Sequence, residues 1–270
     1  MYPQYKAHRK VAEQSLTEAE AEENKMFWET YDMFTTFLRE KTNTSVLRHE
    51  RAEADDLIAR FVHLHPNDEH YIISSDTDYV QLISHNVKQY NGVANQLITL
   101  EGYFDDKGKP AKDKKTGLHK TLGDPQFHLF EKIMRGDAGD NVFSAYPGVR
   151  TKGSKSKVGL TEAYADRHKQ GFSWNNMMLQ RWADPDGVEY RVKDLYERNK
   201  LLIDLTAQPD EIKDLVDLSI IKGVRTTTTP QVGIHFMKFC SKYELNKIGD
   251  QPDSFAKWLN NPYKGELKVV

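Results

Sequence analysis

Three short clusters of acidic residues place the strongest constraint on what this 270-residue chain can fold into. Each cluster adjoins an apolar run that would fix it at the end of a buried helix or strand, so carboxylates from distant parts of the chain can converge. Convergent carboxylates repel one another unless cations lie between them. Oxygen-only ligands suit Mg²⁺ or Mn²⁺, and two such ions about 3.5–4 Å apart commonly promote displacement of an oxygen at phosphorus. The pattern therefore predicts a metal-dependent phosphodiesterase. The clusters are Glu53-Ala54-Asp55-Asp56, Asp76-Thr77-Asp78 and Asp137-Ala138-Gly139-Asp140.

The composition is that of an ordinary globular protein. With 38% hydrophobic and 29% charged residues the chain has enough apolar material for a core, which argues against disorder. No apolar stretch approaches the roughly 20 residues that span a bilayer, and no secretion signal follows the basic opening, so no membrane partner is expected. The single cysteine, Cys240, cannot form an internal disulfide, which fits a reducing, cytoplasmic setting.

Positive charge is concentrated in a few segments although the net charge is −2. Such runs can neutralise phosphates, while a solvated loop is the alternative for each of them. The basic residues in question are Lys6, Arg9 and Lys10, the lysines between 107 and 120, and Arg150, Lys152, Lys155 and Lys157.

Hydrophobic periodicity and capping residues predict an α/β fold with a mostly parallel central sheet, helices on both sides and a helical carboxyl-terminal part. The first cluster then lies in the first turn of a helix, the second at the carboxyl end of a strand and the third just past a helix end. A nuclease-type core is expected in residues 1–145 and a mostly helical, duplex-binding and carboxyl-terminal region in residues 146–270. Ser15 and Thr17 stand at capping-box spacing from Glu18 and Glu20 and predict a helix over about 18–41, and a second helix is expected to begin at 53–56. Asp124-Pro125 predicts a helix over 125–135 that ends at Gly136. Expected strands cover 71–75, 87–90 and 96–100, the last two around an Asn91-Gly92 turn. Residues 105–120 are expected to form a polar, basic loop, and mostly helical structure is expected from about residue 159 to residue 205.

Each cluster also has a structural explanation. Acidic residues in a first helical turn are favoured by the helix dipole alone, which accounts for Glu53, Asp55 and Asp56 without a ligand. Paired acids at a strand end, as at Asp76 and Asp78, are a stronger indication of a site because the fold does not need them there. An EF-hand calcium loop is a poor alternative, since the ligand spacing and terminal Glu are missing.

In their order and spacing, the three motifs resemble those of the flap endonuclease, or 5′-nuclease, family, and most closely its bacteriophage ribonuclease H (5′-exonuclease) branch. The likeness runs from about Tyr5 to at least Asn141. It implies a PIN-like core that binds two Mg²⁺ ions, with Mn²⁺ able to substitute. The motifs are Ala52-Glu53-Ala54-Asp55-Asp56, Ser74-Ser75-Asp76-Thr77-Asp78 and Gly136-Asp137-Ala138-Gly139-Asp140-Asn141. The resemblance implies Glu53, Asp55 and Asp76 as ligands of the first metal, and Asp78, Asp137 and Asp140 as ligands of the second. Asp76 would lie between the ions, and Asp56 would be an accessory acid.

The same resemblance gives roles to basic residues. Tyr5-Lys6-Ala7-His8-Arg9 resembles the start of the family's helical arch, so Lys6 and Arg9 would stabilise charge on the scissile phosphate, with a frayed basic terminus as the alternative. Family members often bind duplex backbone through a helix-turn-helix module. Here an expanded segment would do so, through Arg150, Lys152, Lys155 and Lys157.

The pattern departs from the family ahead of the arch, where two aspartate-bearing strands normally precede it. We therefore expect an amino-terminally truncated core with an incomplete first metal site. Three explanations are open: a fragment, a misplaced start, or the product of a split gene whose separate amino-terminal half supplies those strands. The expected function is 5′ to 3′ exonuclease or flap endonuclease activity of ribonuclease H type on 5′ ends of RNA–DNA or DNA duplexes. Its setting would be primer removal during phage replication in the host cytoplasm, with a single-strand-binding protein or sliding clamp as a partner.

Two other functions stay open. The first is a non-catalytic nucleic-acid-binding fragment of such a nuclease, which would grip duplex without cutting it. The second is a toxin-type ribonuclease of PIN-like fold, whose domains are usually shorter and lack the long arch helix.

Overall fold

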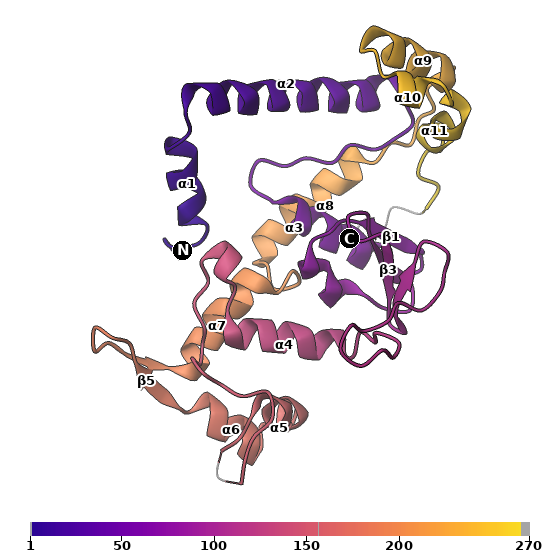
Figure 1. Cartoon of the computed structure of the whole chain (residues 1–270). Helices are drawn as coiled ribbons and strands as arrows, with labels where there is room; N and C mark the ends of the chain where they lie inside the picture. The colour runs from indigo at the N-terminus through magenta and orange to yellow at the C-terminus, as the bar shows by residue number, and fades with distance from the viewer. Residues whose placement is uncertain (1, 156, 266–270) are drawn as a thin grey trace. The chain divides into compact units, whose positions relative to one another are not determined.

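Figure 1 shows a computed structural model of the chain, which describes residues 2–155 and 157–265. The chain divides into two compact units. The sheet unit consists of Met1–Val11 and Asn67–Gln208, and the helical unit of Ala12–Pro66 and Pro209–Val270. The boundaries of these two units differ from the expected division at residue 145. That division separates a nuclease core from a duplex-binding region by function, and it stays a prediction. Among the described residues, no helix combines the length and apolar character that crossing a bilayer requires.

The sheet unit is built on one four-stranded mixed sheet with strand order β1-β2-β3-β4. Its first pair, β1 and β2, is parallel, with His70 opposite Val87, and the other two pairs are antiparallel hairpins. The α/β class is confirmed. The parallel pairing expected for most of the sheet is found in the β1–β2 pair. The strands are β1 (His70–Ile73), β2 (Val87–Asn91), β3 (Gln96–Thr99) and β4 (Gly102–Asp105).

Helices and one small hairpin complete the sheet unit. Helix α4 (Pro125–Arg135) begins where predicted, because the Asp124 side chain accepts from the backbone N–H of Gln126 at 2.9 Å and a proline occupies the first turn. Its buried Met134 packs with residues of α5 and α6 in the largest core cluster. The remaining elements are η1 (Thr77–Leu82), η2 (Ala138–Asp140), α5 (Leu160–Asp166), α6 (Phe172–Met178), β5 (Arg181–Ala183), β6 (Glu189–Arg191) and α7 (Val192–Ile203).

The β5–β6 hairpin is a short non-helical insertion in the region expected to be mostly helical up to residue 205. Strand β5 pairs with β6 in antiparallel register, with Trp182 opposite Tyr190. The turn between them is closed by Asp184, whose side chain accepts from the backbone N–H groups of Asp186 and Val188 at 3.0 and 2.9 Å. An aspartate turn of this kind competes with helix formation for the same backbone donors.

The helical unit contains α2, the long helix predicted from residue 18 to 41. Helix α2 starts with a complete capping box between Thr17 and Glu20, as the sequence indicated. Its carboxyl end packs on α9, where Phe37 and Phe239 stack at 4.2 Å between ring centroids. The helices are α1 (Ala7–Gln14), which begins in the sheet unit, α2 (Glu18–Lys41), α3 (Ala54–Leu64), α8 (Asp210–Gly223), α9 (Val232–Lys242), α10 (Asn246–Gly249) and α11 (Pro252–Leu259).

Candidate metal site

The second acidic cluster lies in the turn that follows β1. Asp76 caps the 3₁₀ helix η1, because its Oδ1 accepts from the backbone N–H of Asp78 at 2.9 Å. The buried Gln89 of β2 holds this turn against the sheet, because its Nε2 donates to the backbone oxygens of Ser74 and Asp76 at 2.9 and 2.6 Å. The turn leaves Asp76 exposed and Asp78 half-buried.

The third cluster lies in a tight turn directly after α4. Gly136 ends the helix with φ +78°, and a Cβ at this position would lie 2.3 Å from the backbone oxygen of Val142. Only glycine therefore allows the chain to double back here. Asp137 and Val142 exchange backbone hydrogen bonds of 2.8 and 2.7 Å, and Asp137 Oδ1 accepts from the N–H of Gly139 at 2.8 Å. These bonds hold both carboxylates of the cluster at the mouth of the turn.

Three carboxylates from these two turns converge. Asp78, Asp137 and Asp140 each offer one oxygen, and the three oxygens lie within 4.8 Å of one another. All three residues are half-buried. This set is the one that the resemblance assigns to the second metal, and three carboxylate oxygens at this spacing suit a hard divalent cation. Their role as ligands stays a prediction.

Lys132 is the residue at this site that sequence reasoning missed. It lies on α4, and its Nζ is 2.7 Å from Asp137 Oδ2 and also forms an ion pair and hydrogen bond with Asp78. The side chain is only 26% exposed. Burial acts to lower the pKa of Lys132, but hydrogen bonds and charge from Asp137 and Asp78 raise it overall. Lys132 is therefore charged at neutral pH.

The two carboxylates that Lys132 contacts respond in opposite directions. Burial raises the pKa of Asp78, and Lys132 offsets this only in part. At Asp137 burial also acts to raise the pKa, but Lys132 and the backbone N–H groups of Gly139 and Asp140 lower it overall. The pKa values of Asp78 and Asp137 are therefore shifted in opposite directions although Lys132 contacts both carboxylates.

The segment that carries Lys6 and Arg9 is bonded to the third cluster. The Arg9 guanidinium lies 2.6 Å from Asp140 Oδ1, and the Lys6 Nζ lies 3.8 Å from Asp140 Oδ2. The backbone N–H of Lys6 also donates to the backbone oxygen of Asp140 at 2.9 Å, and the side-chain Nδ2 of Asn141 donates to the backbone oxygen of Gln4 at 2.8 Å. Both predicted phosphate-binding cations therefore lie beside a predicted metal ligand.

The charges of this site balance more closely than the sequence suggested. Lys132 accompanies Asp78 and Asp137, while Lys6 and Arg9 accompany Asp140. Repulsion among the carboxylates alone therefore does not demand a metal ion. The case for a metal rests on the donor set and its spacing.

The remaining predicted acids are not members of this group of three carboxylates. Asp76 is not one of the three converging carboxylates. Glu53 is the N-cap of α3 in the helical unit, where its backbone N–H donates to Asp56 Oδ2 at 3.0 Å, and Asp55 follows in the first turn. Capping accounts for Glu53 and Asp56 locally. The parts of these four residues in a first metal site stay predictions.

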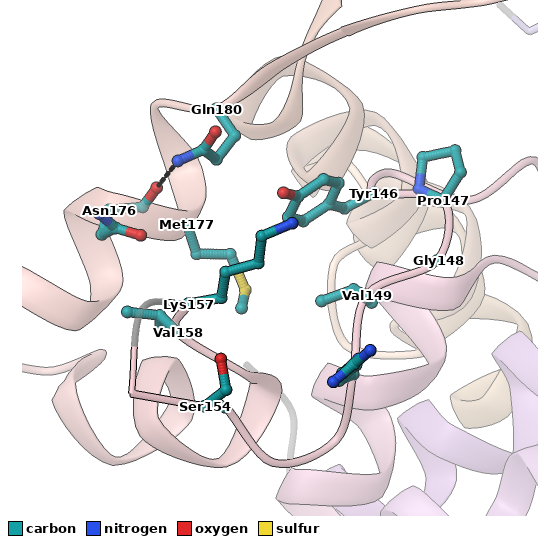
Figure 2. Close-up of a pocket in the computed structure, with 12 residues that line it drawn as sticks. Tyr146, Pro147, Gly148, Val149, Ser154, Lys157, Val158, Asn176, Met177 and Gln180 are labelled. Carbon is teal, nitrogen blue, oxygen red and sulfur yellow. Dashed lines mark hydrogen bonds between the residues drawn. The ribbon is translucent and has the colours of Figure 1, made fainter.

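The segment expected to bind duplex forms a closed loop at the start of α5, seen in Figure 2. The Glu162 carboxylate closes it by accepting from the backbone N–H groups of Gly153 and Gly159 at 3.0 and 2.9 Å. The loop borders a cavity of about 670 Å³, across which the Lys157 side chain extends toward Tyr146. The four predicted cations are all exposed: Arg150, Lys152, Lys155 and Lys157.

Comparison with known proteins agrees with the likeness seen in the motifs. Residues 1–108 match the family model of the 5′-3′ exonuclease N-terminal resolvase-like domain. The resemblance to 5′-nucleases is confirmed. Over 134 residues the chain is 30% identical to a DNA polymerase I of Rhizobium leguminosarum, a match that covers 48% of this chain and 11% of that polymerase.

Two solved structures share the fold. The T5 D15 protein co-crystallised with metal ions aligns with a TM-score of 0.54 at 19% identity, covering 82% of this chain and 79% of that one. The bacteriophage T5 D15 flap endonuclease, in a pseudo-enzyme-product complex with DNA and metal ions, aligns with a TM-score of 0.52 at 18% identity, covering 82% and 77%. The chain therefore has the fold of these 5′-nuclease structures.

Proposed function

We propose that the protein is a divalent-metal-dependent 5′ to 3′ exonuclease or flap endonuclease with ribonuclease H-type activity. The observation that carries the proposal is the convergence of Asp78, Asp137 and Asp140 within 4.8 Å, with Lys6 and Arg9 beside them. Carboxylates that hold a cation and cationic side chains that contact the phosphate are the two parts that phosphodiester hydrolysis needs. The metal ions and DNA in the T5 structures support the same reading.

The residues present fit Mg²⁺, with Mn²⁺ as a substitute. Asp78, Asp137 and Asp140 would hold one ion, and Asp76 with Glu53 and Asp55 would hold a second. Bound ions of this kind supply a water of lowered pKa and stabilise the leaving oxygen. The donor set supports the assignment because it is all carboxylate oxygen, with no histidine or cysteine to favour zinc.

The chain's own cations have separate tasks in this proposal. Lys6 and Arg9 bind the non-bridging oxygens of the scissile phosphate and stabilise the charge that builds on them. Lys132 is a positioning residue, because it holds Asp78 and Asp137 at a fixed separation. The proposed setting is primer removal during phage DNA replication, supported by the phage source of the solved neighbours.

The test is single-turnover cleavage of a 5′-labelled DNA flap and of a 5′-labelled RNA–DNA hybrid in Mg²⁺. Short labelled products are expected from both substrates, and EDTA should abolish them because the carboxylates act through a cation. The same reactions without protein provide the background. Tight binding of both substrates with no cleavage of either would favour the non-catalytic binding protein instead.

Duplex binding by the loop before α5 gives a second prediction. Replacing its four cations with Ala should weaken binding to all duplex sequences alike, because phosphate contacts carry no base information. The slope of log affinity against log salt should flatten by up to about 3.6, at roughly 0.9 for each lost phosphate contact. The replaced residues are Arg150, Lys152, Lys155 and Lys157.

Affinity for a 20-base-pair duplex is measured between 50 and 300 mM NaCl in EDTA. The matched control removes four exposed lysines from the helical unit and should keep most of the slope. An unchanged slope in the loop variant would show that the loop is only solvated. The control residues are Lys238, Lys242, Lys247 and Lys257.

A further inference from the structure

The segment that the sequence indicated as a polar loop, residues 105–120, continues β4 into a folded hairpin. Backbone hydrogen bonds run along its length, from Ala111 N–H to the Tyr103 oxygen and from Lys120 N–H to the Ala111 oxygen, each 2.8 Å. Isolated antiparallel bridges join Phe104 to Pro110 and Lys112 to His119. We call residues 103–120 the basic hairpin. Its backbone is ordered, so its side chains project from fixed positions.

The acidic side chains of the basic hairpin are used by its turns. Asp105 Oδ1 accepts from the backbone N–H groups of Lys107 and Lys109 at 2.9 and 2.8 Å. Asp113 Oδ1 accepts from the N–H groups of Lys115 and Thr116 at 3.0 and 2.8 Å. Both carboxylates therefore lie against backbone, and Asp106 is the exposed acid that remains among the lysines.

Six lysines oppose three aspartates in this short segment. Lys120 places its ammonium 3.6 Å from the centroid of the Tyr103 ring and is half-buried. The other five are exposed, and in the part of the chain that the structure describes none of them forms an ion pair with a carboxylate. An array of unpaired ammonium groups on an ordered backbone attracts a polyanion. The exposed lysines are Lys107, Lys109, Lys112, Lys114 and Lys115.

The root of the basic hairpin adjoins the candidate metal site within the same unit. A cavity of about 250 Å³ has Asp78 and Lys132 on its lining together with Tyr103, from the hairpin, and Leu122, just after it. The hairpin root is held there by His119, whose Nε2 hydrogen-bonds to the Tyr103 backbone oxygen at 3.1 Å. A nucleic acid bound at the candidate metal site would therefore lie close to the hairpin root.

We infer that the basic hairpin binds backbone phosphates of duplex nucleic acid on the β4 side of the cleavage site. The inference rests on the proposed function and adds a contact surface separate from the loop before α5. The hairpin root and the candidate metal site line the same cavity. The substrate of the proposed nuclease would therefore lie near the hairpin, and for this reason we favour duplex over an acidic peptide as its ligand. Contacts of this kind set affinity and position without reading sequence.

The test replaces the five exposed lysines with Gln and retains Lys120, because Lys120 packs on Tyr103. Affinity for a flap duplex is measured against NaCl in EDTA, where no metal-dependent cleavage occurs. The Gln variant should bind at least 10-fold more weakly at 100 mM NaCl. The slope of log affinity against log salt should flatten by two or more, where loss of all five phosphate contacts would flatten it by roughly 4.5. A variant with the same five lysines changed to Arg should keep the wild-type affinity and slope.

Melting temperatures of both variants are compared with the wild type, and the Arg variant shows whether the hairpin tolerates five substitutions. Wild-type affinity and slope in the Gln variant would overturn the inference. Binding of polyglutamate, as a model acidic peptide, is measured in the same way. If the Gln variant loses polyglutamate binding but keeps duplex binding, the surface binds an acidic peptide and the inference is also overturned. Failure of the proposed function is distinct, since the wild type would then bind duplex through this hairpin without cutting it.

Discussion

Changing Asp137 and Asp140 together to Asn should reduce single-turnover cleavage of a 5′-labelled flap by at least about 1,000-fold. Two of the three converging carboxylates would become neutral amides, which bind a divalent cation far more weakly. Metal stabilisation of the transition state is worth several kcal/mol, and each 1.36 kcal/mol is tenfold in rate. The rate is measured at saturating enzyme, so that weaker substrate binding does not contribute.

Metal binding itself is checked by thermal melting with Mn²⁺. The wild type should gain about 2.7 kcal/mol at 100 times the dissociation constant, and the double variant should gain far less. A matched control changes two exposed aspartates of the same unit, Asp186 and Asp194, to Asn and should behave as the wild type does. An equal gain in the Asp137 and Asp140 variant would remove these residues from the metal site.

Helix ends were the part of the fold that the sequence predicted best. Thr17 with Glu20, and Asp124 with Pro125, marked the starts of α2 and α4, and Gly136 marked an end. These signals are local, because the hydrogen bonds that satisfy a helix end come from residues within one turn. The hairpin of β2 and β3 was also indicated, by two expected strands around an Asn91-Gly92 turn.

Short strands and pairings between distant residues were not predictable in the same way. β5 and β6 have three residues each, too few for an alternating pattern to be recognised. The basic hairpin is rich in lysine and glycine, which favour strands poorly, and it is closed by aspartate turns. Its order comes from backbone pairing to Tyr103, which no residue pattern within the loop reveals.

The candidate site was predicted in part. The acids at 78, 137 and 140 were grouped by the family resemblance of the motifs and do converge. Lys132 was missed because a lysine in the last turn of a helix is already favoured by the helix dipole. Its pairing with Asp78 spans 54 positions and depends on how α4 packs against the turn after β1. That pairing also explains why the carboxylates can lie together without a metal ion.

The second large effect is expected in the helical unit, where Arg60 of α3 and Asp217 of α8 form an ion pair. Arg60 Nε lies 2.8 Å from Asp217 Oδ1, and a second contact of 2.5 Å joins the guanidinium to Oδ2. The side chains are only 13% and 12% exposed. The pair therefore lies at the packed face between two helices, where neither charge has ready access to water.

Asp217→Leu should destabilise the protein by about 3–5 kcal/mol, because it leaves the Arg60 guanidinium buried without its partner. Arg60→Met should act similarly on Asp217, while Arg60→Met with Asp217→Leu should lose less than either single change, since no buried charge then remains. Urea unfolding of the four proteins, followed by tryptophan fluorescence and circular dichroism, measures the coupling. Losses below about 1 kcal/mol in both single variants would mean that the pair is solvated as surface pairs are. Glu53 caps α3, and Asp55 and Asp56 lie in its first turn. The cleavage rates of the same variants therefore show whether activity depends on this helix. A cleavage rate that falls only in proportion to the folded fraction would give the helix a purely structural role.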